Sequence, residues 1–160
     1  MKIYFAGAIR GGRELQPTYS TITEHLENRG HTVLTTHVAV EGVLEKELLL
    51  HPQEIFSRDI KWLDECQLVV ADVTIPSLGV GYEISSALTR EKPVLCIYRQ
   101  GTNLSAMING NRDKNITVCE YDDDESMLNI IDEFILVTSK RNNRKHHKSY
   151  STSPMTKQMA

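Results

Sequence analysis

The sequence predicts an α/β protein in which a five-stranded parallel sheet is covered by helices on both faces. Two observations carry this prediction. Five short runs rich in Val, Ile, Leu and Tyr alternate with segments whose apolar residues recur at helical spacing, which implies right-handed crossovers between parallel strands. The continuous apolar run at residues 68–71 also suits a central strand that is buried on both sides.

These patterns assign each element along the chain. The expected strands comprise residues 2–6, 31–36, 68–72, 93–98 and 116–120. The expected helices are marked by Ile22 and Leu26 after Pro17, by Ile55, Ile60 and Leu63, by Val80, Ile84, Ala87 and Leu88, and by Met127, Ile130, Ile131 and Phe134. Residues 38–52 fit either a loop or a short helix, and the sequence does not decide between them.

The distribution of charge divides the chain into a body and a tail. Residues 139–160 hold six Lys and Arg and no acidic residue, so the net charge of −3 leaves −9 on residues 1–138. Because the basic stretch is polar and lacks periodicity, we predict one folded domain at residues 1–138 and a disordered tail at residues 139–160. The tail is compatible with nuclear import or weak nucleic-acid contact, although a solvated extension without a fixed role fits it better.

Composition argues against several classes of protein. No run of about 18 apolar residues could span a membrane, and no secretory signal is visible. Cys66, Cys96 and Cys119 are odd in number and lack metal-ligand spacing, which favours reduced, buried thiols and a cytoplasmic location, with a nuclear one also compatible. The acidic body argues against nucleic acid as a partner, because phosphate contacts need a basic face.

The first candidate for a binding site is the loop after the first strand, since ligands of such sheets bind outside the carboxyl ends of the strands. The loop contains Gly7, Gly11 and Gly12 together with Arg10 and Arg13. Glycines permit close approach of the backbone to a ligand, and arginines can neutralise a phosphate. The pattern matches neither a GxGxxG turn nor a Walker loop, and a flexible turn with surface arginines is the alternative.

The second candidate is the segment from Asp72 to Glu83. Ser77 is expected to start a helix, where its hydroxyl can cap the helix or face an anion. Gly79 and Gly81 then fall in the first turns, at a cost of about 1 kcal/mol each relative to alanine. Helical side chains lean towards the N-terminus, so a ligand could rest beside Gly79 against the Glu83 carboxylate. A surface helix acid is the plainer interpretation, but the two glycines favour a functional one.

Four further residues are weaker candidates by themselves. Asp59 could supply a second carboxylate beside Glu83 for acid–base work, although its neighbours Arg58 and Lys61 suggest a surface ion pair. Tyr4 fits core packing, His37 is expected to close the second strand, and Ser105 is expected to cap a helix or bind phosphate.

Taken in order along the chain, five segments resemble the 2′-deoxynucleoside 5′-phosphate N-hydrolases of the nucleoside 2-deoxyribosyltransferase superfamily. They are Tyr4-Phe-Ala-Gly-Ala-Ile-Arg-Gly-Gly-Arg13, Thr36-His-Val38, Arg58-Asp-Ile-Lys-Trp-Leu63, Pro76-Ser-Leu-Gly-Val-Gly-Tyr-Glu83 and Leu104-Ser-Ala-Met-Ile108. The resemblance covers residues 2–135 and implies a flavodoxin-like or Rossmann-like three-layer sandwich that acts as a homodimer. It also implies that residues 1–138 form a deoxynucleotide N-hydrolase domain.

The resemblance further implies a role for each candidate. Glu83 would attack C1′ of the deoxyribose and form a covalent intermediate, Asp59 would handle the proton on the departing base or orient the sugar, and Tyr4 would position Glu83. No metal or organic cofactor is expected. The substrate-binding residues would be Gly7, Ala8, Ile9, Arg10, Gly11, Gly12, Arg13, Tyr19, His37, Ser77, Gly79 and Glu83, with Ser105, Ala106 and Met107 contributed by the partner subunit.

Two departures and two alternatives remain open. Thr36 and Asp72 stand where the family often has glutamate, which leaves the preferred base undecided. A nucleoside 2-deoxyribosyltransferase would use the same nucleophile, but the arginines and serines suit a dianionic phosphate better than a free 5′-hydroxyl. A nucleotide-binding sensor without catalysis is the alternative from another class.

Overall fold

The computed structural model describes the backbone of residues 1–150 and the side chains of residues 1–141, and it confirms the predicted fold class. Five parallel strands form one sheet in the order β2-β1-β3-β4-β5. The strands are β1 (Lys2–Ala6), β2 (Thr32–Val33), β3 (Leu68–Asp72), β4 (Val94–Arg99) and β5 (Ile116–Tyr121). The central strand β3 is buried along its whole length, as its continuous apolar run predicted.

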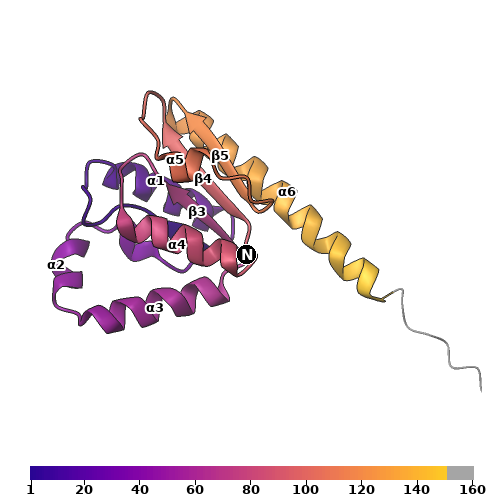
Figure 1. Cartoon of the computed structure of the whole chain (residues 1–160), viewed down its shortest axis with the longest axis horizontal. Helices are drawn as coiled ribbons and strands as arrows, with labels where there is room; N and C mark the ends of the chain where they lie inside the picture. Colours follow the sequence, from indigo (N-terminus) through magenta and orange to yellow (C-terminus); the bar gives the residue numbers. More distant parts are fainter. Residues whose placement is uncertain (151–160) are drawn as a thin grey trace, which may run out of the picture.

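Helices cover both faces of the sheet (Figure 1). The helices are α1 (Gln16–Asn28), α2 (Val43–Leu48), α3 (Pro52–Glu65), α4 (Leu78–Thr89), α5 (Ala106–Asn109) and α6 (Asp124–Tyr150), with a 3₁₀ helix η1 (Thr36–Ala39) after β2. α1 and α6 pack on one face, while α3 and α4 pack on the other.

The alternation of side chains along β1 decides which residues reach the functional face. Ile3 and Phe5 point into the core formed with α1 and α6, whereas Tyr4 and Ala6 point into the core formed with α3 and α4. Since successive side chains of a strand point to opposite faces, Tyr4 is directed towards α4 by its register alone.

The second strand is shorter than expected. It was predicted at residues 31–36 but ends at Val33, and the chain then turns into η1. The reason is local: Thr35 is buried, and its hydroxyl donates to the Phe5 carbonyl (2.6 Å) and accepts from the Phe5 amide (2.9 Å), in place of a strand ladder. The prediction that His37 closes strand two is therefore wrong, because His37 lies in η1. The undecided segment 38–52 contains the end of η1 and the helix α2.

The last helix runs further than expected. α6 continues to Tyr150 and projects away from the sheet (Figure 1), so the disorder predicted from residue 139 does not describe residues 139–150. Extending a helix that is already nucleated costs far less than starting one, so a polar sequence without a core can continue it. The remainder of the predicted tail, residues 151–160, lies outside the described residues.

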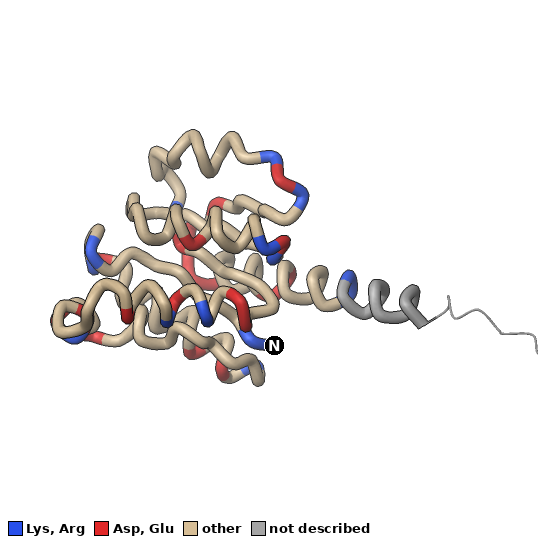
Figure 2. Tube along the Cα trace, turned by 60° about the horizontal axis from the view of Figure 1, so that its bottom comes forward, with Lys and Arg blue, Asp and Glu red and all other residues tan. Residues whose placement is uncertain are grey.

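Three further properties were predicted from the composition: the absence of a membrane span, the distribution of charge and the state of the cysteines. Within the part of the chain that the structure describes, no helix is both long and apolar enough to cross a membrane. Figure 2 shows basic and acidic residues interspersed along the trace. Cys66 and Cys96 are buried and Cys119 is half-buried, and all three are free thiols.

Candidate active site

A cavity of about 470 Å³ opens at the carboxyl ends of β1 and β3. The position is the one expected for ligand binding in a parallel sheet with this topology. Residues from the loop after β1, from η1, α2, α3 and the start of α4 line it: Tyr4, Gly7, Ile9, Arg10, Gly11, His37, Val38, Glu47, Ile55, Asp59, Pro76, Ser77, Leu78, Gly79, Val80 and Glu83.

Glu83 and Tyr4 form the centre of this cavity. The Tyr4 hydroxyl donates a hydrogen bond of 2.7 Å to Glu83 Oε1. Burial raises the pKa of Glu83 to about 7, while the bond from Tyr4 opposes that rise. Burial and the neighbouring Glu83 carboxylate raise the pKa of Tyr4, so the phenol remains a donor. A carboxylate that titrates near neutral pH in a cavity is typical of functional sites.

The start of α4 leaves room in front of Glu83. Ser77 precedes the helix, and its hydroxyl accepts from the Val80 amide at 3.4 Å. A side chain at Gly79 would contact only the Ser77 hydroxyl, 3.8 Å away, among the atoms described. Gly79 is therefore not required by packing within the chain, and the space beside it belongs to the cavity.

Asp59 lies in the same cavity and is bound by Arg58. The Arg58 Nε donates to Asp59 Oδ1 at 2.9 Å, and its Nη2 donates to Glu47 Oε1 at 2.7 Å. The guanidinium also lies over the Trp62 ring, 5.0 Å from its centroid. The ion pair with Arg58 expected from the sequence does exist, but it lies at the cavity and not on an exposed helix surface, since both side chains are at most 25% exposed.

His37 contacts the same arginine. Its Nε2 lies 3.2 Å from Arg58 Nη2, and since guanidinium only donates, Nε2 is the acceptor and the proton lies on Nδ1. Burial and the Arg58 charge lower the pKa of His37, so the ring is neutral at neutral pH. Nδ1 is buried without a hydrogen-bond partner among the described residues.

The loop after β1 divides into residues that face the cavity and residues that hold the loop. Gly7, Ile9, Arg10 and Gly11 line the cavity, and Arg10 is exposed there. The glycines are also needed by packing. A Cβ at Gly7 would lie 2.9 Å from the Tyr19 ring, and one at Gly11 would lie 2.7 Å from the Pro76 carbonyl oxygen.

The other candidates in this loop lie outside the cavity. Arg13 donates to the carbonyl groups of Val38 (3.0 Å) and Val40 (3.1 Å), which joins the loop to the segment after β2. Tyr19 is fully buried, and its hydroxyl accepts from the amide of the buried Ala8 at 3.2 Å. Gly12 has a φ of +145°, a conformation that favours glycine. Within one chain none of these four residues lines the cavity, and Tyr19 belongs to α1.

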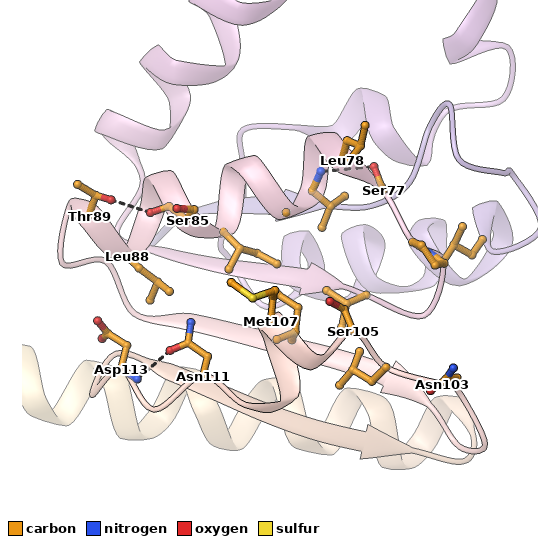
Figure 3. Close-up of a pocket in the computed structure, with 18 residues that line it drawn as sticks. Ser77, Leu78, Ser85, Leu88, Thr89, Asn103, Ser105, Met107, Asn111 and Asp113 are labelled. Atoms are coloured by element: carbon orange, nitrogen blue, oxygen red, sulfur yellow. Dashed lines mark hydrogen bonds between the residues drawn. The ribbon is translucent and has the colours of Figure 1, made fainter.

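Ser105, Ala106 and Met107 do not reach the Glu83 cavity within one chain. Ser105 precedes α5 but makes no side-chain capping bond. Ser105 and Met107 line a separate groove of about 750 Å³ between α4 and α5 (Figure 3). The groove and the cavity share the residues at the start of α4, namely Pro76, Ser77, Leu78 and Val80.

Sequence reasoning missed Glu47 and undervalued Arg58. Glu47 belongs to α2, in the segment that could not be assigned, and nothing in its local sequence distinguishes it from the surface acids Glu41 and Glu45. Only a confident prediction of the helix α2 could have indicated that Glu47 faces the protein interior. Among the side chains described, no three His, Cys, Asp or Glu residues are arranged to hold a metal ion.

Comparison with known proteins places the chain in a family. The model of the nucleoside 2-deoxyribosyltransferase family matches residues 3–131. A putative 2′-deoxynucleoside 5′-phosphate N-hydrolase 1 from Methanococcoides burtonii is 44% identical over 118 residues, which cover 74% of this chain and 97% of the relative. The 5-hydroxymethyl-dUMP N-hydrolase of Danio rerio is 42% identical over 144 residues, which cover 88% and 99%.

Solved structures share the fold at low sequence identity. The CMP N-glycosidase of Clostridium botulinum superposes with a TM-score of 0.63 at 19% identity and covers 84% of this chain and 99% of its own. A 2-deoxyribosyltransferase from Bacillus psychrosaccharolyticus has a TM-score of 0.58 at 18% identity, with coverage of 81% and 91%. At these identities the likeness supports the fold alone.

Proposed function

The chain belongs to the nucleoside 2-deoxyribosyltransferase family, and on that premise we propose that it hydrolyses the N-glycosidic bond of 2′-deoxynucleoside 5′-monophosphates. The products are 2-deoxyribose 5-phosphate and a free base. The observation that carries the proposal is the Glu83 carboxylate, which Tyr4 holds at 2.7 Å beside the open space at Gly79. The names of the N-hydrolase relatives support the same reaction.

Glu83 is the nucleophile of the proposed reaction. Its Oε1 accepts from Tyr4, while Oε2 has no hydrogen-bond partner among the described residues. Oε2 attacks C1′, the bond from C1′ to the base nitrogen breaks, and the base leaves with the electron pair and takes up a proton. Water then attacks C1′ of the glycosyl ester and regenerates the carboxylate, as in retaining glycosidases.

Asp59 is the second carboxylate. It handles the proton on the departing base or orients the sugar, and its position in the same cavity as Glu83 suits either task. Arg58 holds Oδ1, which leaves Oδ2 for the substrate. The fixed orientation matters because a misplaced catalytic group loses much of its effect.

The 5′-phosphate binds at the end of the cavity formed by Arg10, Gly11 and Ser77. Arg10 is exposed at the cavity and makes no side-chain hydrogen bond or ion pair with the described residues, so its guanidinium can pair with a dianion. Ser77 lies at the N-terminus of the twelve-residue helix α4, where the helix dipole favours negative charge.

A second copy of the chain completes the phosphate site in this proposal. Ser105, Ala106 and Met107 lie on the groove beside α4 rather than in the Glu83 cavity. Leu78 is 97% exposed and Met107 is 82% exposed, and apolar surface of this kind typically marks an interface. Ser77 lines both the groove and the Glu83 cavity. Packing of two copies through the groove would therefore bring Ser105 of one copy towards Ser77 of the other.

A transferase that passes the deoxyribosyl group to another base is the second candidate. It uses the same nucleophile, and one of the structural neighbours is a 2-deoxyribosyltransferase. The exposed arginine at the cavity favours a phosphorylated substrate and hence the hydrolase.

The test is base release from a panel of deoxynucleoside monophosphates, ribonucleoside monophosphates and free deoxynucleosides, with and without an added acceptor base. We expect base and deoxyribose 5-phosphate from the deoxy monophosphates alone, and loss of activity of at least about 1,000-fold in Glu83→Ala. Trapping of a glycosylated Glu83 by mass spectrometry tests the covalent step. Activity confined to free deoxynucleosides, or dependent on the acceptor base, makes the protein a transferase. Tight nucleotide binding without turnover makes it a sensor.

A further inference from the structure

A third carboxylate lines the cavity and has no part in the proposed chemistry. Glu47 projects from α2 and is 6% exposed, yet it lines the same cavity as Glu83 and Asp59. Acidic side chains are almost never this buried unless they are paired. Its partner is Arg58, whose Nη2 donates to Glu47 Oε1 at 2.7 Å.

The pairing uses only half of the Glu47 carboxylate. Oε1 accepts from Arg58, whereas Oε2 has no hydrogen-bond partner among the residues described. Oε2 is not among the buried polar atoms that lack a partner in the part of the chain that the structure describes, so it is open to solvent. Because Glu47 lines the cavity and a carboxylate can accept at both oxygens, Oε2 is free to accept a hydrogen bond from a ligand there.

His37 cannot donate to this carboxylate. Its Nε2 lies 3.5 Å from Glu47 Oε1, but Nε2 already accepts from Arg58 and carries no proton. Two acceptors thus face the same guanidinium, and the lowered pKa of His37 keeps the ring from gaining a second proton at neutral pH.

The position of Glu47 in the cavity indicates which part of a nucleotide it meets. Arg10 and Ser77 make the phosphate end, and a carboxylate beside a phosphate would repel it. Glu47 shares the Arg58 guanidinium with Asp59 and His37, and among the described residues it makes no hydrogen bond with Arg10 or Ser77. With Arg10 and Ser77 assigned to the phosphate and Glu83 and Asp59 to the sugar, Glu47 lines the rest of the cavity together with the apolar Ile55 and Val38. This part of the cavity is where the base would lie.

We propose that Glu47 recognises the nucleobase by accepting a hydrogen bond at Oε2 from an N–H or O–H group of the base. The inference rests on the proposed function and assigns the specificity of that same site. A carboxylate accepts and never donates, so it favours a base that presents an amino, imino or hydroxyl donor at this point and disfavours one that presents a carbonyl oxygen. Arg58 acts as a positioning residue, because it fixes Glu47 and Asp59 with one guanidinium.

The test combines changes in the protein with changes in the base. The substrate is the deoxynucleoside monophosphate that the native protein hydrolyses best, compared with analogues in which one N–H or O–H of the base is replaced by C–H. The variants are Glu47→Ala and Glu47→Gln, and Glu45→Gln on the exposed side of α2 is the matched control. Circular dichroism and thermal melting establish that each variant is folded.

The analogue that lacks the donor bound by Glu47 should have a kcat/KM about 10- to 100-fold below that of the parent substrate, because the charged acceptor then has no donor. The native protein and Glu45→Gln should both show this difference. Glu47→Ala should hydrolyse that analogue and its parent at rates within about twofold, because the interaction is already absent. Glu47→Gln keeps an acceptor oxygen and should retain part of the discrimination.

A merely structural role for Glu47 gives a different result. Glu47→Ala would then lower kcat/KM by the same factor for the parent and for every analogue, and that outcome overturns the inference. Failure of the proposed function is distinguishable, because the native protein would then release no base from any deoxynucleoside monophosphate.

Discussion

The two hollows on either side of the start of α4 differ in size and in chemistry. The groove next to α5 is the larger, at about 750 Å³, but Asp113 is the one titratable residue among those that line it. The smaller cavity of about 470 Å³ contains Glu83, Asp59, Glu47, His37 and Arg10. Figure 3 shows the groove side chains, among which Leu78, Leu88 and Met107 are apolar.

Under the proposed function the smaller cavity is the reactive site, and what distinguishes it from the groove is not its size but the hydrogen-bond partners of its carboxylates. In the cavity each of the three carboxylates has one oxygen bound by a protein donor, with Tyr4 on Glu83 and Arg58 on both Asp59 and Glu47. Such preorganised groups are what catalysis needs. The groove presents apolar side chains that are up to 97% exposed, which is a surface suited to packing. The cavity is lined by residues of one chain, whereas the groove is where the proposed second copy would pack.

The largest effect on the chemistry of the cavity, as opposed to the groove, is expected from Asp59→Asn. The amide keeps the size of the side chain but removes the charge, and we expect kcat to fall about 100- to 10,000-fold through the lost acid–base or orienting function. Asp64→Asn on the same helix is the control, because Asp64 is 59% exposed and pairs with Arg90 away from the cavity. Steady-state base release measures both. Equal activity of the two variants would remove Asp59 from the site.

The role of the groove is tested by Met107→Asp. Met107 is 82% exposed in the groove, and a charge there should prevent packing of a second copy. We expect sedimentation to show a monomer and KM for the monophosphate to rise about 10- to 100-fold, since charge-assisted contacts from the partner are lost. Leu136→Asp on α6, a site that is 54% exposed, is the control. A fully active monomer would contradict the shared phosphate site.

The internal electrostatics of the cavity are tested by Tyr4→Phe. The hydroxyl stabilises the ionised Glu83 and lowers its pKa, so its removal should raise that pKa above about 7. Because the nucleophile acts as the anion, kcat/KM should fall as the pH drops through the pKa of Glu83. If the pKa rises by about one unit, the ionised fraction of Glu83 at pH 7 falls from about a half to about a tenth, so the variant should lose about fivefold there and recover at higher pH.

The pH profile of kcat/KM reports the ionisation of the free enzyme and is the measurement to make. Tyr98→Phe on β4 serves as the control for the loss of a tyrosine hydroxyl. A loss of activity that is equal at every pH would mean that Tyr4 acts on something other than the ionisation of Glu83.

Local patterns predicted the sheet and the four long helices, because hydrophobic periodicity determines which face of an element is buried. They also pointed to Glu83, since two glycines in the first turns of α4 are costly without a reason. The family was predicted from the resemblance of five segments and not from periodicity. The hydrogen bond from Tyr4 follows from strand register together with the position of α4, and it was expected only through the family resemblance.

What the sequence could not supply are relations between distant segments. Arg13 stays a predicted phosphate ligand, and nothing in the sequence indicated that it also donates to the carbonyl groups of Val38 and Val40. Glu47 joins the site because Arg58 on α3 donates a hydrogen bond to it from a different helix. Neither contact has a signature within one segment, since each depends on the packing of loops whose positions are set by the whole sheet.

The smallest effect is expected from the end of α6, which is remote from both hollows. Thr138 is buried and the Ser139 hydroxyl lies 3.3 Å from Met1 Sδ, so α6 is attached to the domain up to this point. Deletion of residues 142–160 keeps these contacts and keeps every described residue that lines the cavity or the groove. We expect kcat/KM to stay within about twofold, as for changes at surface positions. A loss confined to the monomer–dimer equilibrium would assign the end of α6 to the interface, and a loss of kcat at saturating protein concentration would assign it to the cavity. Either result would contradict the division of the molecule into one reactive hollow and one packing surface, because a third region would then contribute.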